Sequence, residues 1–158
     1  MRGCDTLRLS DVARADPLAD IASCWLLGTV SVSVYLDGEG YRRPAAKLRR
    51  LGEALMGCVV REVGHPAVFS AMAKVMSARE AASGPLFAEC PAVWLHDTAD
   101  AITYLRECGE TKTARQLQAL HKLARNVLER EWGQGGVERA LGSVKLLRDP
   151  VAAGSAVQ

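Results

Sequence analysis

The stretch that decides the fold is Thr29–Tyr41, which reads "TVSVSVYLDGEGY". From Thr29 to Leu36, apolar residues alternate with residues that carry a hydroxyl group, and this period of two is typical of a strand. The valines and the tyrosine favour the same conformation, and the "DGEG" that follows is typical of a turn. The segments on both sides show helical periodicity instead. The fold therefore depends on whether this stretch is a strand or part of a helix.

Two interpretations of the stretch remain open from the sequence. A single strand cannot satisfy its own backbone hydrogen bonds, so a strand here needs a partner, and residues 6–10 ("TLRLS") offer one. The result would be a minor two-stranded β element of residues 6–10 and 29–36. Alternatively, the stretch continues the preceding helix, and that helix must then be buried on all sides because its apolar residues spread around it. We favour the helix, because both neighbouring segments are helical.

The remainder of the chain predicts a mainly α fold, a compact bundle of five to six helices. Apolar residues recur at helical spacing in several segments, and glycines or prolines separate them. The first helix is expected to begin at Asp16 and Pro17, and the fourth to be capped by Asp97. We find no second copy of any helical hairpin at a fixed period and predict no repeat. The expected helical segments are residues 17–28, 44–63, 65–83, 97–108, 111–132 and 137–147.

Length and composition indicate one soluble domain. The chain has 158 residues, of which 49% are hydrophobic and 24% charged, and its formal net charge is +2. These values are ordinary for a globular protein. We expect residues 1–149 to form a single helical domain and residues 150–158 to be a flexible tail.

The five cysteines are odd in number, form no CxxC pair and stand beside apolar residues. We therefore predict free, buried thiols in a reducing bacterial cytoplasm. The first residues lack the apolar segment of a secretory signal, and no apolar run is judged long enough for a membrane span. No metal or cofactor is expected, because histidines and cysteines do not cluster at ligand spacing.

The strongest local charge signal is "YRRPAAKLRR", residues 41–50. If the helix extends back through Arg43, then Arg43, Lys47, Arg50 and Arg61 lie on one side of it, away from the apolar residues. We name these four residues the first basic stripe, and Arg42 adjoins it. Small residues within the stripe would allow a partner to approach closely, and the neighbouring Tyr41 could stack on a base.

A second basic stripe consists of Arg115, Lys122 and Arg125 on the helix predicted at residues 111–132. Polar amides accompany these cations, a mixture that phosphate-binding surfaces often use. Both stripes are also compatible with ordinary solvated helix faces. Whether they merge into one patch depends on the fold.

These observations predict a non-enzymatic protein-binding module, for which no catalytic motif is needed. A small phage- or plasmid-encoded inhibitor or adaptor, acting on a host defence complex through a basic helix face, would fit. Its partner would present an acidic surface. The alternative is a DNA- or RNA-binding accessory protein that uses the same cations, whose affinity would depend strongly on salt. The predicted binding residues are Arg42, Arg43, Lys47, Arg50, Arg61, Arg115, Lys122 and Arg125.

Overall fold

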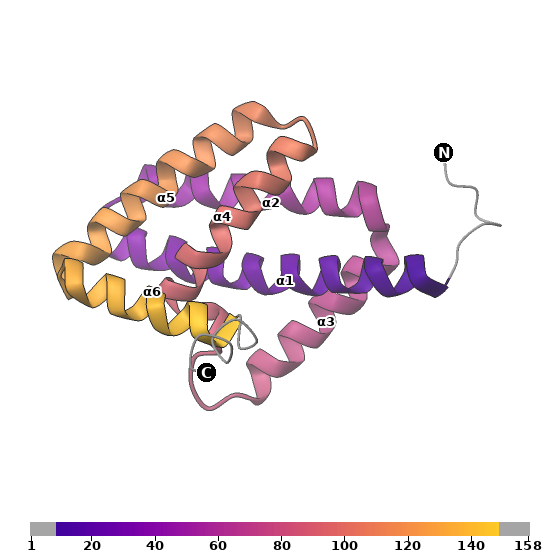
Figure 1. The fold of residues 1–158 in the computed structure, drawn as a ribbon, viewed down its shortest axis with the longest axis horizontal. Coiled ribbons are helices and arrows are strands. Elements are labelled where there is room, and N and C mark those ends of the chain that lie inside the picture. Colours follow the sequence, from indigo (N-terminus) through magenta and orange to yellow (C-terminus); the bar gives the residue numbers. More distant parts are fainter. Residues whose placement is uncertain (1–8, 149–158) are drawn as a thin grey trace, which may run out of the picture.

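The fold is an all-α bundle of two three-helix groups (Figure 1). It is given by a computed structural model that describes residues 9–148, with side chains from Pro17 onward. Over this range there are six α-helices, a short 3₁₀ helix and no strand, so the predicted bundle is confirmed and the minor β element is wrong. The elements are α1 (Leu9–Gly38), α2 (Arg42–Val63), α3 (His65–Ala81), η2 (Phe87–Glu89), α4 (Pro91–Glu107), α5 (Thr111–Trp132) and α6 (Gln134–Arg148).

The strand-like stretch is the C-terminal part of α1, and its hydroxyl groups explain why a helix can form there. Thr29 donates its hydroxyl hydrogen to the Trp25 carbonyl at 2.8 Å, and Ser33 donates to the Thr29 carbonyl at 2.7 Å. Both side chains are buried. Because each polar group finds its partner one turn back in the same helix, burial leaves neither hydroxyl unpaired.

The apolar residues of this stretch divide between two sides of α1. Val32 and Leu36 are buried in the core, whereas Val30 and Val34 are 46% and 63% exposed. The expectation that a helix here must be buried on all sides is therefore wrong. The helix is apolar around most of its circumference, and one side of it faces solvent.

Several helix boundaries differ from the sequence prediction. Pro17 lies inside α1, which begins at Leu9, and so does not start the helix. Asp97 lies inside α4, because Pro91 occupies the first turn, where proline is well tolerated. The suggested strand partner, residues 6–10, falls partly in α1 and partly outside the described residues, as does the proposed tail at 150–158.

The two three-helix groups are copies of one unit, offset by 69 residues. Gly40 and Gly109 both have positive φ (94° and 82°), as do Gly64 and Gly133 (89° and 76°). The first pair ends α1 and α4 in the same way: the following residue donates its amide hydrogen to a carbonyl five residues back, Tyr41 to Leu36 at 2.8 Å and Glu110 to Leu105 at 2.9 Å. Such a bond with a glycine in the left-handed region forms a Schellman motif. The prediction of no repeat is wrong.

The sequence carries the same repeat, weakly. We name residues 22–79 the first repeat and residues 91–148 the second repeat. At this offset, 16 of the 58 aligned positions are identical. Most of the identical pairs are buried in both copies or belong to turns, which are the positions that packing constrains most. The buried identical pairs include Trp25/Trp94, Thr29/Thr98, Leu36/Leu105, Ala45/Ala114, Leu48/Leu117, Leu51/Leu120 and Val68/Val137.

The repeats face each other across a pseudo-twofold axis. Tyr35 donates its hydroxyl hydrogen to Glu131, and the equivalent Tyr104 donates to Glu62 at 2.7 Å. Each pair joins equivalent residues in the opposite order, which is the reciprocity that a twofold axis imposes on an interface. α2 and α5 accordingly run antiparallel, since Arg61 at the end of α2 meets Glu110 at the start of α5 at 3.6 Å.

One segment of α1, Pro17–Gly38, is long and apolar enough to span a membrane by length and composition alone. The expectation that no apolar run reaches that length is therefore wrong. In this fold, however, the segment packs against α2, α3 and α4 and contributes Trp25, Val32 and Leu36 to the core. A buried core helix satisfies the same length criterion.

Candidate functional site

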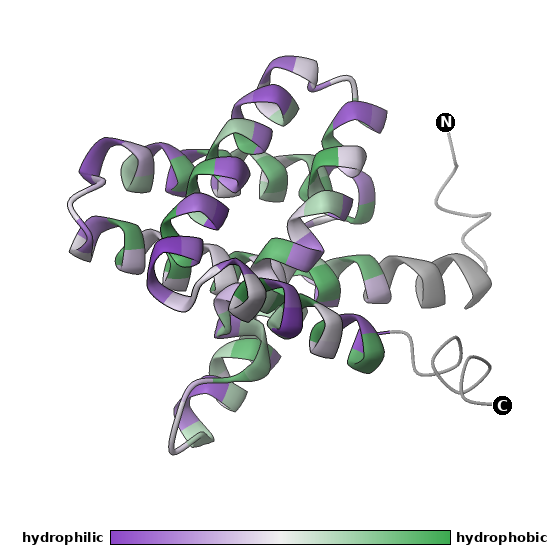
Figure 2. Ribbon diagram, turned by 60° about the vertical axis from the view of Figure 1, so that its left-hand side comes forward, coloured by the Kyte–Doolittle hydropathy of each residue, from purple (hydrophilic) through white to green (hydrophobic). Residues whose placement is uncertain are grey.

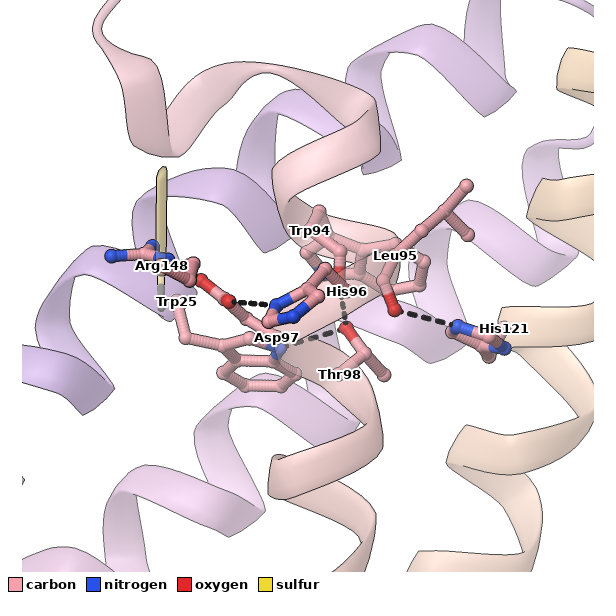
Figure 3. A network of polar contacts seen from close by, with 8 residues as sticks. All are labelled: Trp25, Trp94, Leu95, His96, Asp97, Thr98, His121 and Arg148. Atoms are coloured by element: carbon pink, nitrogen blue, oxygen red, sulfur yellow. Dashed lines mark hydrogen bonds and ion pairs between the residues drawn. The ribbon is translucent and has the colours of Figure 1, made fainter. Parts of the chain in front are cut away.

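The centre of the molecule holds a closed set of hydrogen bonds between α1 and α4, and Figure 3 shows the half of it that Trp25, Thr98 and Trp94 form. The Trp25 indole donates to the Thr98 hydroxyl at 2.9 Å, and Trp94 donates to the Thr29 hydroxyl at 3.0 Å. Each threonine in turn donates to the carbonyl of the tryptophan in its own helix, at 2.5 Å for Thr98 and 2.8 Å for Thr29. All four side chains are buried. This tryptophan–threonine network fixes the two repeats against each other.

A charged contact beside this network fixes the end of α6. The His96 Nδ1 donates to Asp97 at 2.9 Å, and Arg148 donates to the other oxygen of the same carboxylate at 2.5 Å. The Arg148 guanidinium also lies 5.1 Å from the centre of the Phe87 ring, a cation–π distance. The adjacent His96 and Asp97 thus do face each other, and the pair connects α4 to α6 in a structural role.

An open cleft of about 410 Å³ lies between α4, α5 and α6. Its polar groups are largely bound to one another: Arg125 pairs with Glu129 at 3.0 Å and with Glu138, and His121 donates from Nε2 to the Leu95 carbonyl at 2.8 Å. Burial lowers the pKa of His121, so its ring is neutral at pH 7. The cleft is lined by Leu95, His96, Ala99, His121, Arg125, Glu138, Leu141, Gly142 and Lys145.

Acidic, histidine and cysteine side chains are the ones that could hold a metal ion. Over the described part of the chain, no group of three or more such side chains is arranged to hold a metal ion. Four cysteines fall in this range, and all four are free thiols. Cys58 is buried and Cys24 half-buried, but Cys90 and Cys108 are exposed, so the prediction that the thiols are buried fails for two of them.

The first basic stripe lies on the outer side of α2. Arg43 and Arg50 are exposed and Lys47 is half-buried, while Leu48 and Leu51 on the opposite side are in the core. The helix begins at Arg42, so Arg43 belongs to it as the stripe requires. Within residues 17–148, Arg43, Lys47 and Arg50 form no ion pair and no side-chain hydrogen bond. Among the described side chains, none neutralises these three charges.

Arg61, the fourth member of this stripe, and the neighbouring Tyr41 are engaged inside the molecule. Arg61 contacts Glu110 and donates to the Cys58 sulfur at 3.1 Å. The Tyr41 hydroxyl accepts a hydrogen bond from Arg130 at 2.8 Å, and the Tyr41 ring packs against the core. Tyr41, which was expected to be able to stack on a base, is therefore already held in place by contacts within the protein.

The second basic stripe does not form one surface. Arg115 and Lys122 are exposed on α5, but Arg125 is half-buried and bound to Glu138 of α6 at the cleft. Among residues 17–148, the densest group of cations that form no ion pair lies on the first half of α2. We name Arg42, Arg43, Lys47, Arg49 and Arg50 the α2 basic face.

The repeat provides an internal reference for the α2 basic face. Residues Arg42–Arg50 carry five cations, and the equivalent residues Thr111–Ala119 carry two, Lys112 and Arg115. Because α5 forms the same 22-residue helix at the equivalent place, the fold does not require those five charges. The concentration of charge on α2 is thus a property of the surface and not of the scaffold.

Comparisons with known proteins give no further guide. No protein-family model, no curated protein and no solved structure matches the chain. The functional argument therefore rests on the geometry described above.

Proposed function

We propose that this protein is a non-enzymatic protein-binding module whose α2 basic face docks on an acidic surface of a partner protein. The observation that carries the proposal is the difference between the two repeats. The first nine residues of the equivalent helices α2 and α5 carry five cations in one copy and two in the other, with the same burial pattern beneath them. A charge cluster that folding does not require is best explained by a contact with something outside the chain.

Electrostatics give this surface a specific effect on binding. Unpaired cations on one helix face attract an acidic partner from a distance and raise the rate of association. The effect weakens with ionic strength, because salt screens exposed charges over about 8–10 Å. The polar groups of the cleft, in contrast, are bound to each other and offer no comparable excess of charge.

A nucleic-acid partner is the second candidate for the same cations. Base stacking on an aromatic side chain is a large part of sequence-independent single-strand binding. Tyr41, the aromatic residue beside the α2 basic face, is held by Arg130 and by the core. This contact favours a protein partner.

We further propose that the protein is a small inhibitor or adaptor of a host defence complex in the bacterial cytoplasm, because a 17 kDa scaffold with one charged surface suits that role.

Affinity capture from extracts of the native host, with nuclease treatment, tests the proposal. The test variant is R43E/K47E/R50E, and the matched control is K112E/Q116E/A119E at the equivalent positions of α5. Each residue changed in α2 has the same degree of exposure as its equivalent in α5. A protein partner should be captured by the wild type and by the α5 variant, and lost from the α2 variant. Loss of the partner on nuclease treatment alone would favour the nucleic-acid function.

A further inference from the structure

The cleft of the second repeat has a chemically different counterpart in the first repeat. Five of its nine lining residues are charged or are histidines: His96, His121, Arg125, Glu138 and Lys145. The equivalent residues of the first repeat are Leu27, Gly52, Met56, Phe69 and Met76. No charged or histidine side chain stands at any of the nine equivalent positions. The same place in the fold is polar in one copy and apolar in the other.

Several of these apolar side chains are exposed to solvent. Phe69 is 67% exposed, Met76 49% and Val30 46%. Leu27 is half-buried, and so is Met72, which is equivalent to Leu141 of the cleft. Figure 2 shows α3 extending from the rest of the molecule with hydrophobic turns along it. We name Leu27, Val30, Phe69, Met72 and Met76 the α1–α3 apolar face. Grouped exposed apolar side chains mark interaction sites, and methionines adapt to varied partners.

Cations continue from this face along α2. Arg42, Arg49 and Met56 follow one another at intervals of seven residues, so they lie along one line of the helix. Met56 occupies a position equivalent to the cleft lining, and Arg49 and Arg42 lie one and two steps further toward the start of α2. Both arginines are exposed. The side of α2 that carries Met56 therefore continues, toward the start of the helix, into the α2 basic face.

We propose that the α1–α3 apolar face binds an amphipathic helix of an acidic partner, with its apolar side on Val30, Phe69 and Met76 and its carboxylates toward Arg42 and Arg49. This inference rests on the proposed function, because it assigns the contact chemistry of the same partner. A helix that lays its apolar side on exposed hydrophobic residues is a recurring mode of recognition. The bordering arginines select a helix with acidic flanks over one with basic flanks.

The chain itself supplies the test variant. F69E/M76K places on α3 the residues that α6 carries at the equivalent positions, Glu138 and Lys145. Because the second repeat folds with those residues, and because Phe69 and Met76 are exposed, the unfolding midpoint should be unchanged. The matched control is L146S/L147A, which places on α6 the small residues of α3. Leu146 and Leu147 are 59% and 67% exposed, so the control removes a similar apolar surface elsewhere.

The probes are synthetic peptides of about 20 residues, long enough for a helix in isolation. One carries leucines on one side and glutamates on the flanks, a second has lysines on the flanks, and a third has serines for the leucines. Fluorescence anisotropy should show the acidic-flank peptide binding the wild type at least about 10-fold more tightly than either other peptide. F69E/M76K should weaken it at least about 10-fold, and L146S/L147A should leave it unchanged.

The outcomes separate this inference from the proposed function. Equal binding of all three peptides, or no loss with F69E/M76K, would overturn the helix-binding face. Self-association of the wild type that F69E/M76K removes, seen by analytical ultracentrifugation, would assign the face to a second copy and also overturn it. R43E/K47E/R50E leaves Arg42 and Arg49 in place, so peptide binding should persist in that variant. If it persists while capture of the native partner is also unaffected, the proposed function fails and the peptide-binding face stands.

Discussion

Replacing Thr29 or Thr98 with valine tests the tryptophan–threonine network that joins the two repeats. Valine keeps the branched shape of threonine and removes only the hydroxyl group. In T29V, the Trp94 indole N–H loses its acceptor at 3.0 Å, and in T98V the Trp25 indole N–H loses its acceptor at 2.9 Å. Both indoles are buried, at 1% and 5% exposure, so water cannot replace the lost partner.

The expected cost follows from leaving one buried donor unpaired. That penalty is about 1–3 kcal/mol, which corresponds to a fall in melting temperature of about 2–4 °C per kcal/mol for a chain of this size. The carbonyl that each threonine hydroxyl contacts belongs to its own helix and is four residues back, so it retains its backbone partner. Because Thr29 and Thr98 are equivalent residues, T29V and T98V should cost the same to within about 1 kcal/mol.

Urea unfolding followed by circular dichroism and tryptophan fluorescence measures these costs. T103V is the control, because Thr103 donates to the Ala99 carbonyl at 3.2 Å in the same manner but is exposed. It should change the free energy of unfolding by no more than about 0.5 kcal/mol. If T29V and T98V behave like T103V, or if only one of them destabilises the protein, the reciprocal network is not what holds α1 against α4.

Three further predictions concern backbone, protonation and thiols. Gly64→Ala and Gly133→Ala should each cost about 1–3 kcal/mol in urea unfolding, because both residues have positive φ, whereas Gly142→Ala, inside α6 with open space around it, should be neutral or stabilising. Burial lowers the pKa of His121, so the unfolded chain binds a proton at this imidazole more readily than the folded chain does. The free energy of unfolding should therefore fall as pH drops below about 6.5. H121Q should reduce that fall, and an unchanged pH profile in H121Q would refute this prediction. Burial also raises the pKa of Cys58, so at pH 7 its thiol should react with iodoacetamide more slowly in the native protein than in urea, and equal rates would be inconsistent with its burial.

The helical class could be read from the sequence because it depends on local periodicity. Leu48, Leu51 and Leu55 recur at helical spacing, which predicts the inner side of α2, and all three are buried there. Local periodicity alone left the Thr29–Leu36 stretch open, because the alternation of Thr29, Ser31 and Ser33 with valine imitates a strand; the helix favoured from the neighbouring segments is confirmed. The Thr29 and Ser33 hydroxyls donate hydrogen bonds to carbonyls one turn back in the same helix. These bonds depend on helix geometry, which a period-two sequence pattern does not reveal.

The repeat could not be predicted because its identical residues are few and scattered. Their alignment becomes evident only when the two three-helix groups are compared in the structure. The repeating unit is three helices long, and only 16 of its 58 aligned positions are identical. Two short matches were present: "WLLGT" at Trp25–Thr29 and "WLHDT" at Trp94–Thr98 share their first, second and last residues. Each pairs a tryptophan with a threonine four residues on, the spacing that places both on one helix side. That spacing was the detectable clue.

The predicted binding residues also differ in how far local helical spacing could place them. Arg43, Lys47 and Arg50 could be placed on one face from helical spacing alone, since that face depends only on local geometry. Arg125 could not be assigned correctly, because its partner Glu138 comes from α6, thirteen residues along and beyond a turn. Phe69 and Met76 stand at helical spacing among the apolar residues of α3, which predicts the inner side of the helix, and only the packing of α3 shows that they face solvent.

The most direct test of the α2 basic face is the association rate of the captured partner as a function of salt, measured for three proteins. The wild type and K112E/Q116E/A119E should associate at similar rates that fall as salt increases. R43E/K47E/R50E should associate at least about 10-fold more slowly at low salt, with a rate that rises as salt screens the new repulsion. Equal rates and equal salt dependence for all three proteins, in variants that unfold like the wild type, would contradict docking through the α2 basic face.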